Sequence, residues 1–393
     1  ALLGLFGAML MPSTLSLLRS IFQNRDQRRL AIAVWASAFS AGSALGPIVG
    51  GFLLEHFDWG SVFLIAVPVL IPLLIAAPLL VPESRDPNPG RIDIVSIVLS
   101  MAAMIPVVYA IKSLAVDGPS LTAGAWALLG VAMGYLFVRR QLTAEVPMLD
   151  MGLFRRGSFS GAILVNLLSV VALVGFLYFV SQHLQLVLGL SPMMAGAALV
   201  PGMLAMIVAG LSVVPISRRV PPHILVPVGL VFSVAGYLLV AFTTSDHGIA
   251  PLVIAFVVLG IGIGGAETIS NELILSSAPA EKAGAASAVS ETAYELGAVL
   301  GTAVLGGLIT AFYRGALVVP VDIPAEAAHA ATETLAGAYT AAQELPAQLG
   351  DALWDAASAA FGSGVMVTSL IGAGLVVLAG VIAAVTLRKA PAH

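Results

Sequence analysis

Two acidic residues lie inside a long apolar stretch of the sequence, where a charged side chain is costly and needs a reason. Glu291 and Glu295 stand four residues apart in the segment ETAYE, so a helix places both carboxylates on one face. Two carboxylates this close, and away from water, can hold a proton at neutral pH and release it when water or a cation arrives. The sequence therefore predicts a proton-coupling pair. The alternative is a structural hydrogen bond to a neighbouring helix.

A third acid and an amide extend this candidate site. Glu267 follows Gly264 and Gly265, two residues that can let the chain open around its carboxylate. We predict that Glu267 lines the same cavity and shares in proton coupling, with a purely structural role as the alternative. Asn166 lies in another apolar stretch, where it is either a substrate ligand or a hydrogen-bonding link between helices.

Aromatic rings are candidates for binding a planar, cationic substrate, because ring faces attract cations and stack on flat molecules. Four residues are predicted to bind substrate in this way: Phe176, Tyr178, Phe179 and Tyr294. Tyr294 is the strongest candidate, since it stands beside both glutamates. For each of the others, packing bulk or contact with lipid is the alternative.

The composition indicates what surrounds these residues. Of 393 residues, 59% are hydrophobic and only 10% are charged, and the mean hydropathy is +1.03. A water-soluble domain carries about 25% charged residues, so lipid must cover most of this protein. The chain has no cysteine for a disulfide or thiolate metal site, and we expect no cofactor. It also lacks the phosphate-binding loop of an ATP-driven pump and a basic face for nucleic acid.

Eleven apolar stretches are long enough to cross a membrane, which takes about 20 residues. They predict an all-α membrane protein with spans at 1–21, 30–54, 60–81, 92–113, 121–138, 158–185, 192–216, 222–243, 249–273, 284–311 and 361–387. The first stretch is typical of the remainder of a spanning helix and not of a signal peptide, so we expect further residues before it.

Basic residues predict the orientation, because Lys and Arg are enriched in cytoplasmic loops. Of the 17 Lys and Arg residues, all but Lys112 and Arg314 lie at one set of alternating span ends. That set is Arg19, Arg25, Arg28, Arg29, Arg85, Arg91, Arg139, Arg140, Arg155, Arg156, Arg218, Arg219, Lys282, Arg388 and Lys389. The C-terminus is therefore predicted to be cytoplasmic.

Small residues recur at four-residue spacing in the second span. Gly42, Gly46 and Gly50 lie on one helix face, and Pro47 bends the helix between them. Such spacing lets two helix backbones approach closely in lipid, so we predict a seam with a helix of the other half of the molecule. The pattern returns as LGAVLGT at 296–302, which indicates an internal repeat of the kind found in transporters.

The stretch AGSALGPIVGGFLLEHFDW resembles the antiporter signature of the 14-spanning drug:proton antiporters of the major facilitator superfamily. The signature, G-x-x-x-G-P-x-x-G-G, is filled by Gly42, Gly46, Pro47, Gly50 and Gly51. The resemblance implies two six-helix halves plus two linker helices, with 11 of 14 helices present. It implies three regions: 1–81 for family helices four to six, 92–138 for the linker helices, and 158–387 for the C-terminal half with an extracellular loop at 312–360.

The resemblance further implies a proton-coupled exporter of amphipathic, often cationic compounds, such as dyes, quaternary ammonium compounds and fluoroquinolones. It would work by alternating access, as a monomer, in a bacterial cytoplasmic membrane. Its partners would be small amphipathic molecules, protons and the lipid bilayer, with no nucleic acid. The residues alone leave two other functions open: export of a lipid, siderophore or metabolite, and a membrane-embedded enzyme or scaffold.

The predicted loop 312–360 carries six acids, and its Ala-rich stretches predict short amphipathic helices. The acids are Asp322, Glu326, Glu333, Glu344, Asp351 and Asp355. They either attract cations to the outer face or merely keep the loop soluble.

Overall fold

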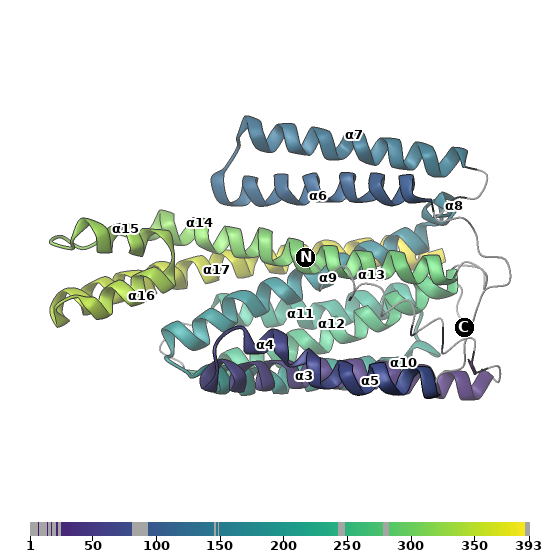
Figure 1. Ribbon diagram of the computed structural model, residues 1–393, viewed down its shortest axis with the longest axis horizontal. Helices are drawn as coiled ribbons and strands as arrows, with labels where there is room; N and C mark the ends of the chain where they lie inside the picture. The colour runs from purple at the N-terminus through teal and green to yellow at the C-terminus, as the bar shows by residue number, and fades with distance from the viewer. Residues whose placement is uncertain are drawn as a thin grey trace.

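Every regular element among the described residues is helical in the computed structural model. The structure describes residues 25–80, 93–144, 149–242, 248–277 and 283–389, with a few isolated positions besides. Figure 1 shows long helices running side by side along one axis. The predicted all-α fold is therefore confirmed.

The helices alternate in direction along the chain. The first group is α3 (Arg25–His56), α4 (Ser61–Leu64), α5 (Ala66–Leu80), α6 (Ile94–Asp117), α7 (Leu121–Thr143) and the short α8 (Met151–Phe154). The second is α9 (Gly157–Gln182) with its π-helical end η1 (His183–Val187), α10 (Pro192–Ser217), α11 (Pro222–Ala241) and α12 (Ala250–Ser277). The third is α13 (Ala283–Leu300), the π-helical turn η4 (Gly301–Leu305), α14 (Gly306–Ala316), α15 (Ala325–Glu333), α16 (Leu335–Glu344), α17 (Ala347–Thr386) and η5 (Leu387–Lys389).

Nine helical segments among the described residues are long and apolar enough to cross a membrane. They coincide with nine of the eleven predicted spans, and α3 covers the predicted span 30–54. The predicted span 1–21 lies almost wholly outside the described residues. The total of eleven spans therefore stays a prediction.

Short polar signals begin several of these apolar helices. The hydroxyl of Ser191 accepts a hydrogen bond from the backbone N–H of Met194 at 3.3 Å, and Pro192 occupies the first turn of α10. Ser120 caps α7 through the N–H of Ala123 at 3.1 Å. Because a capping oxygen satisfies a backbone N–H that has no partner within the helix, these caps favour a helix start at Pro192 and at Leu121.

The largest buried core lies between α9, α11, α12 and α17. The ring of Phe176 stacks on Phe256 with ring centroids 5.4 Å apart and meets Tyr237 edge-on. The hydroxyl of Tyr237 donates a hydrogen bond to the carbonyl oxygen of Ala172 at 2.5 Å. Helix α9 is buried along most of its length, so it forms the centre of this half of the molecule.

Helices α6 and α7 form a hairpin that packs beside α13 and α14. Arg140 joins the two helices through a bidentate pair with Asp93, with Nη2–Oδ1 and Nε–Oδ2 distances of 2.8 and 3.0 Å. Hydrogen bonds from the Arg140 and Ser96 side chains hold the pKa of Asp93 well below its usual range. The carboxylate is therefore ionised at neutral pH and clamps the start of α6 to the end of α7.

The predicted loop 312–360 is wrong in one respect, because α17 begins at Ala347 and continues unbroken into the last span. The predicted short helices are confirmed as α15 and α16. The hydroxyl of Tyr313 donates to the carbonyl oxygen of Ala331 at 2.7 Å, and Leu335 and Leu353 are buried among small residues. Figure 1 shows α15, α16 and the start of α17 projecting beyond the other helices. We call this part, residues 317–360, the outer cap.

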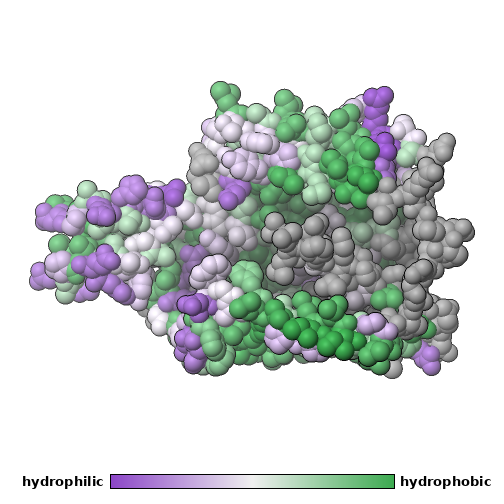
Figure 2. Space-filling model, viewed as in Figure 1, coloured by the Kyte–Doolittle hydropathy of each residue, from purple (hydrophilic) through white to green (hydrophobic). Residues whose placement is uncertain are grey.

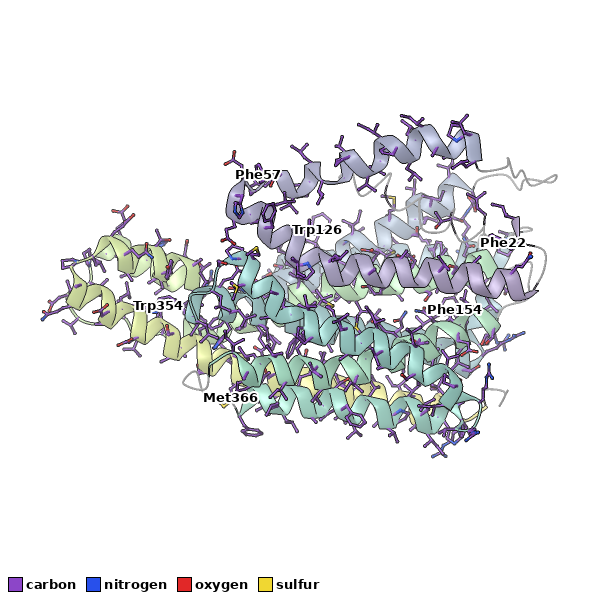
Figure 3. All side chains as sticks on the ribbon, turned by 90° about the horizontal axis from the view of Figure 1, so that it is seen from below. Phe22, Phe57, Trp126, Phe154, Trp354 and Met366 are labelled. Carbon is purple, nitrogen blue, oxygen red and sulfur yellow. The ribbon has the colours of Figure 1, made fainter. Side chains whose placement is uncertain are left out.

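The outer surface matches this division. In Figure 2 the bundle is mostly coloured hydrophobic and the outer cap mostly hydrophilic. Figure 3 shows Trp354 in the cap and Phe154 toward the opposite end. Large apolar side chains such as Leu74 and Leu121 are exposed by 78% and 95% on the bundle. Such an apolar surface is stable in lipid and not in water, as expected of a membrane-spanning bundle.

Candidate functional site

Helices α12 and α13 bring the three predicted coupling acids together around one tyrosine. Glu267 comes from α12, and Glu291 and Glu295 come from α13. All three carboxylates lie within electrostatic range of the Tyr294 hydroxyl, and the two on α13 are within range of each other. The structure thus makes a single site of residues that the sequence places on two helices.

This cluster lies far from the ends of both helices. Glu267 is ten residues before the end of α12 at Ser277, or about 15 Å along the helix axis. Tyr294 is eleven residues after the start of α13 at Ala283, or about 16 Å. The hydrocarbon core of a membrane is about 30 Å thick, so both residues lie near its middle. Glu267 is deeper than the sequence indicated, because α12 runs four residues beyond the predicted end at 273.

The three carboxylates differ in exposure. Oε1 of Glu267 is buried and has no hydrogen-bond partner within the described residues. Glu291 is half-buried and Glu295 is exposed on the outer face of α13. None of the three forms an ion pair within the part of the chain that the structure describes. They can therefore gain or lose a proton without breaking a salt bridge.

A chain of hydrogen bonds joins three helices beside this cluster. Nδ2 of Asn166 on α9 donates to the hydroxyl of Ser290 on α13 at 3.4 Å. The same hydroxyl donates to Oδ1 of Asn271 on α12 at 2.5 Å. We call Asn166, Ser290 and Asn271 the amide–serine chain. It favours the linking role for Asn166, and a ligand role for that residue stays a prediction.

The sequence analysis missed Ser290 and Asn271. Their spacing held a signal, because Asn271 is four residues after Glu267 and Ser290 is four residues before Tyr294. Each pair therefore shares one helix face. The contact between these two faces depends on how α12 and α13 pack together. A local sequence pattern does not predict that packing.

The predicted aromatic substrate residues lie elsewhere. Phe176 and Phe179 are fully buried and contact each other edge-on, with ring centroids 5.3 Å apart. Tyr178 is 38% exposed and lies against Gly306 at the start of α14. Phe176 is ten residues from Asn166 along α9, or about 15 Å. Of the four aromatic candidates, Tyr294 alone lies within electrostatic range of the three acids, and substrate binding by the other three stays a prediction.

The antiporter motif meets the second half of the molecule through α10. A methyl group built on Gly51 would lie 2.5 Å from the carbonyl oxygen of Pro192, and one built on Gly196 would collide with the carbonyl of Pro47. Gly42, Gly46 and Gly50 contact no described residue in this way. The predicted seam therefore exists between α3 and α10, but Gly51 and Pro47 form it and the predicted stripe does not.

The second copy of the small-residue pattern serves a different contact. Methyl groups built on Gly297 and Gly301 would lie 2.9 and 2.7 Å from the carbonyl oxygens of Leu167 and Val171. These glycines let α13 and η4 pack directly on α9. The two related motifs thus join α3 to α10 and α13 to α9.

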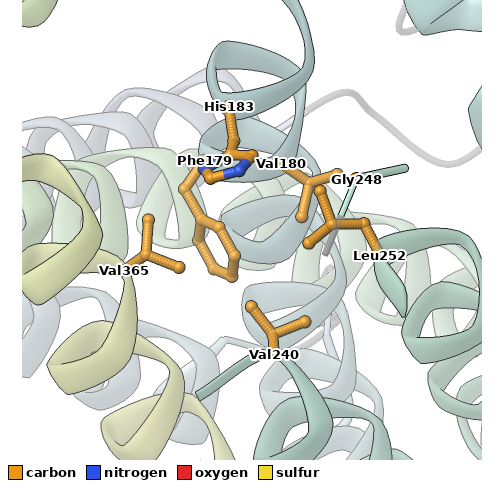
Figure 4. A pocket seen from close by; sticks show the side chains of 7 residues that line it. All are labelled: Phe179, Val180, His183, Val240, Gly248, Leu252 and Val365. Atoms are coloured by element: carbon orange, nitrogen blue, oxygen red, sulfur yellow. The ribbon is translucent and has the colours of Figure 1, made fainter. Parts of the chain in front are cut away.

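A small cavity lies near the outer end of α9 (Figure 4). Its lining includes Phe179, Leu252, Val365 and the imidazole of His183, whose Nδ1 is buried without a partner among the described residues. Its volume of about 20 Å³ holds one water molecule and no drug-sized ligand. It is therefore too small to be a substrate site in this structure.

Long apolar helices that carry carboxylates near the middle of the membrane are typical of a multi-pass membrane protein of the transporter class. The family model described as Major Facilitator Superfamily matches residues 1–302. The chain belongs to this superfamily of transporters and is a multi-pass protein of the bacterial plasma membrane.

Curated relatives fit this assignment. The chain is 54% identical to the multidrug efflux pump LfrA of Mycolicibacterium smegmatis, over 99% of the chain and 77% of that protein. It is 33% identical to the methyl viologen resistance protein SmvA of Salmonella typhimurium, over 92% of the chain and 73% of that protein. It is 32% identical to the tetracenomycin C resistance and export protein of Streptomyces glaucescens, over 99% and 74%.

Proposed function

We propose that this protein is a proton-coupled exporter of amphipathic, often cationic compounds that works by alternating access. The observation that carries the proposal is the cluster of Glu267, Glu291 and Glu295 around Tyr294 near the middle of the membrane. The relatives named for multidrug efflux, methyl viologen resistance and antibiotic export support the choice of cargo.

The cluster suits exchange of protons for a cation. Each carboxylate can be neutral with a bound proton or charged without one, and a charged carboxylate in a low-dielectric site attracts a cation strongly. A cationic compound that enters beside Tyr294 favours the charged form and so displaces protons. When protons return from the other side, the carboxylates no longer hold the cation and it leaves. The ring of Tyr294 adds a face on which a flat cation can stack.

The proposal includes the orientation. Arg155, Arg156, Arg218, Arg219 and Arg388 lie at one end of the bundle, where α9 and α11 begin and α10 and α17 end. Because basic residues mark the cytoplasmic side, we place this basic end and the C-terminus in the cytoplasm. The outer cap then faces outward. We propose a monomer as the working unit.

Replacing the acids with glutamine tests the coupling. Glu267→Gln, Glu291→Gln and Glu295→Gln keep the size of the side chain and remove its titration. We expect at least one of them to abolish efflux of ethidium driven by a pH gradient in vesicles, with folded protein at the parental level. Glu272→Gln is the matched control, since Glu272 lies on α12 only five residues before its end and is exposed.

Two results would contradict the proposal. Parental rates of ethidium efflux in all three variants would show that these acids do not couple transport. Absence of efflux for ethidium and other amphipathic cations in the parent, together with transport of a lipid, siderophore or metabolite, would assign a different cargo.

A further inference from the structure

We propose that a water path runs through the interior of the protein between α9, α12 and α13. Along this path the amide–serine chain passes protons between the basic end of the bundle and Glu267. This inference rests on the proposed function, because it assigns a route to the proton that Glu267 exchanges. Asn271 and Asn166 act as positioning residues that hold the waters and the relaying hydroxyl of Ser290 in line.

Exposure and hydrogen bonding together indicate which end of the path is open to water and which end is buried. Asn271 is exposed and only six residues before the end of α12, so it forms the entrance. Ser290 lies between the two amides, accepting a hydrogen bond from Asn166 and donating one to Asn271. Asn166 is 1% exposed and forms the inner end. A hydroxyl both donates and accepts, so Ser290 is the member of the chain that can relay a proton.

Three buried oxygen atoms near this chain are free to bind water. Oδ1 of Asn166, Oγ of Ser270 and Oε1 of Glu267 are all buried with no hydrogen-bond partner within the described residues. Buried polar atoms nearly always bond to protein or to ordered water, and a buried water makes about three such bonds. One or two waters would therefore satisfy several of these atoms at once.

The packing of α9 on α12 places these atoms at one depth. Phe176 stacks on Phe256, and the two helices run in opposite directions. Asn166 lies ten residues from Phe176 toward the basic end. Position 266, next to Glu267, lies ten residues from Phe256 toward the same end. Asn166 therefore lies level with Glu267, which completes the path from Asn271 to the carboxyl group.

The proton step balances without any further reactant. The protonated carboxyl of Glu267 gives its proton to the first water, leaving a carboxylate. Each water and the Ser290 hydroxyl then accepts one proton and passes one on, until a proton enters solvent beside Asn271. The reverse sequence recharges Glu267.

Other ionisable groups near Glu267 lie on α13 and on α12 itself. On α13, Tyr294 is within electrostatic range of Glu267, and Glu291 and Glu295 are within range of Tyr294. On α12 itself, Glu272 lies five residues nearer the helix end. Of the remaining helices packed on α12, α10 has no ionisable residue. Away from the helix ends, the ionisable residues of α9 and α11 are Tyr178 and Tyr237. Both lie farther from the basic end than Glu267 does. The described interiors of α9, α10 and α11 therefore offer no carboxylate or amine that could substitute for the path.

Three variants separate this role from simple packing. Ser290→Ala removes the relaying hydroxyl, and Ser290→Thr restores it. Thr292→Val is the control, because Thr292 is exposed on the same helix and its hydroxyl bonds only to the carbonyl of Ala288.

Proton release on ethidium binding provides the first measurement. The full chain in weakly buffered detergent solution is mixed with ethidium, and a pH indicator follows the released protons by stopped flow. We expect Ser290→Ala to slow release by about fivefold, the effect of losing one hydrogen bond of about 1 kcal/mol. The number of protons released and the ethidium affinity should be unchanged, and Ser290→Thr and Thr292→Val should release at the parental rate. Parental rates in Ser290→Ala overturn the path.

Radiolytic hydroxyl-radical labelling provides a second measurement that does not depend on coupling. Tyr294 lies one helical turn from Ser290 on the same face of α13, so water in the path can reach its ring. That water should produce fast labelling of the ring in the parent and much slower labelling in Ser290→Ala. Equal labelling in the two proteins contradicts the water path. If the parent releases no proton when ethidium binds, the proposed coupling fails, while the labelling result still decides whether the water path exists.

Discussion

Phe176 and Tyr294 show how side chains of similar type take different roles at the residue scale. The sequence places both in apolar helices and makes both candidates for stacking on a substrate. In the structure Phe176 is fully buried between Phe256 and Tyr237, whereas Tyr294 faces three carboxylates. Helix spacing predicts which residues share a face, as it did for Glu291 and Glu295. It does not predict what the face meets, because that depends on packing between distant segments.

Replacing Phe176 tests whether this residue packs in the protein core or binds the substrate. Phe176→Ala removes a ring that fills the centre of the α9 core, which costs about 3–5 kcal/mol in a water-soluble protein and less in lipid, where the hydrophobic driving force is weak. We expect a lower melting temperature and lower yield, with unchanged ethidium affinity for each folded molecule. Tyr178→Ala on the same helix is the control, and thermal melts and fluorescence titrations in detergent provide the measurements.

A clear loss of ethidium affinity in Phe176→Ala, without loss of stability, would contradict the core assignment. Phe176→Leu keeps most of the volume and allows the same comparison if the alanine variant does not fold.

At the scale of the helices, some local sequence patterns predict helix limits and others do not. Runs of apolar residues predicted nine of the described spans to within about five residues of their observed limits, and a tenth at its C-terminal end alone. The start of α17 was missed, because residues 347–360 carry Asp351 and Asp355 and lack a continuous apolar run. They are helical through packing of small residues, such as Gly350 against the carbonyl of Ala342, in the outer cap. An apolar-run criterion detects contact with lipid and not helix formation as such.

Glycine substitutions in α3 test the observed seam with α10. Gly51→Ala places a methyl group 2.5 Å from the backbone oxygen of Pro192, so the two helices must separate. We expect reduced ethidium efflux per folded molecule, because packed interfaces switch between discrete arrangements and do not deform smoothly. Gly46→Ala meets no described residue and should retain parental efflux.

Efflux normalised to folded protein measures both variants. Cysteine accessibility from the two sides of the membrane, using cysteines introduced into this cysteine-free chain, reports the state in which each protein rests. A larger loss in Gly46→Ala than in Gly51→Ala would show that the seam uses the predicted stripe after all.

The arrangement of the whole molecule separates the acidic cluster from the outer cap. Glu295 lies 21 residues before the end of α14 at Ala316, or about 30 Å along the helix axis. All six acids of the cap are exposed. At physiological salt the Debye length is about 8 Å, so their field is screened long before it reaches the cluster. The sequence identified these acids but left their role open, because it gave no distance between them and the coupling site.

Neutralising the cap therefore should have little effect on cation export. In the triple variant Asp322→Asn, Glu326→Gln and Glu333→Gln, asparagine suits position 322, whose positive φ of 76° it tolerates well. We expect ethidium efflux within about twofold of the parent at 0.15 M salt, since exposed charges contribute little at this range. At 0.01 M salt the Debye length reaches about 30 Å, and there a modest slowing of cation entry is expected. A neutral amphipathic dye is the control at both salt concentrations, because the field of the cap acts on charge alone. A large loss for ethidium at 0.15 M salt, with the neutral dye unaffected, would show that the cap recruits cations by direct contact.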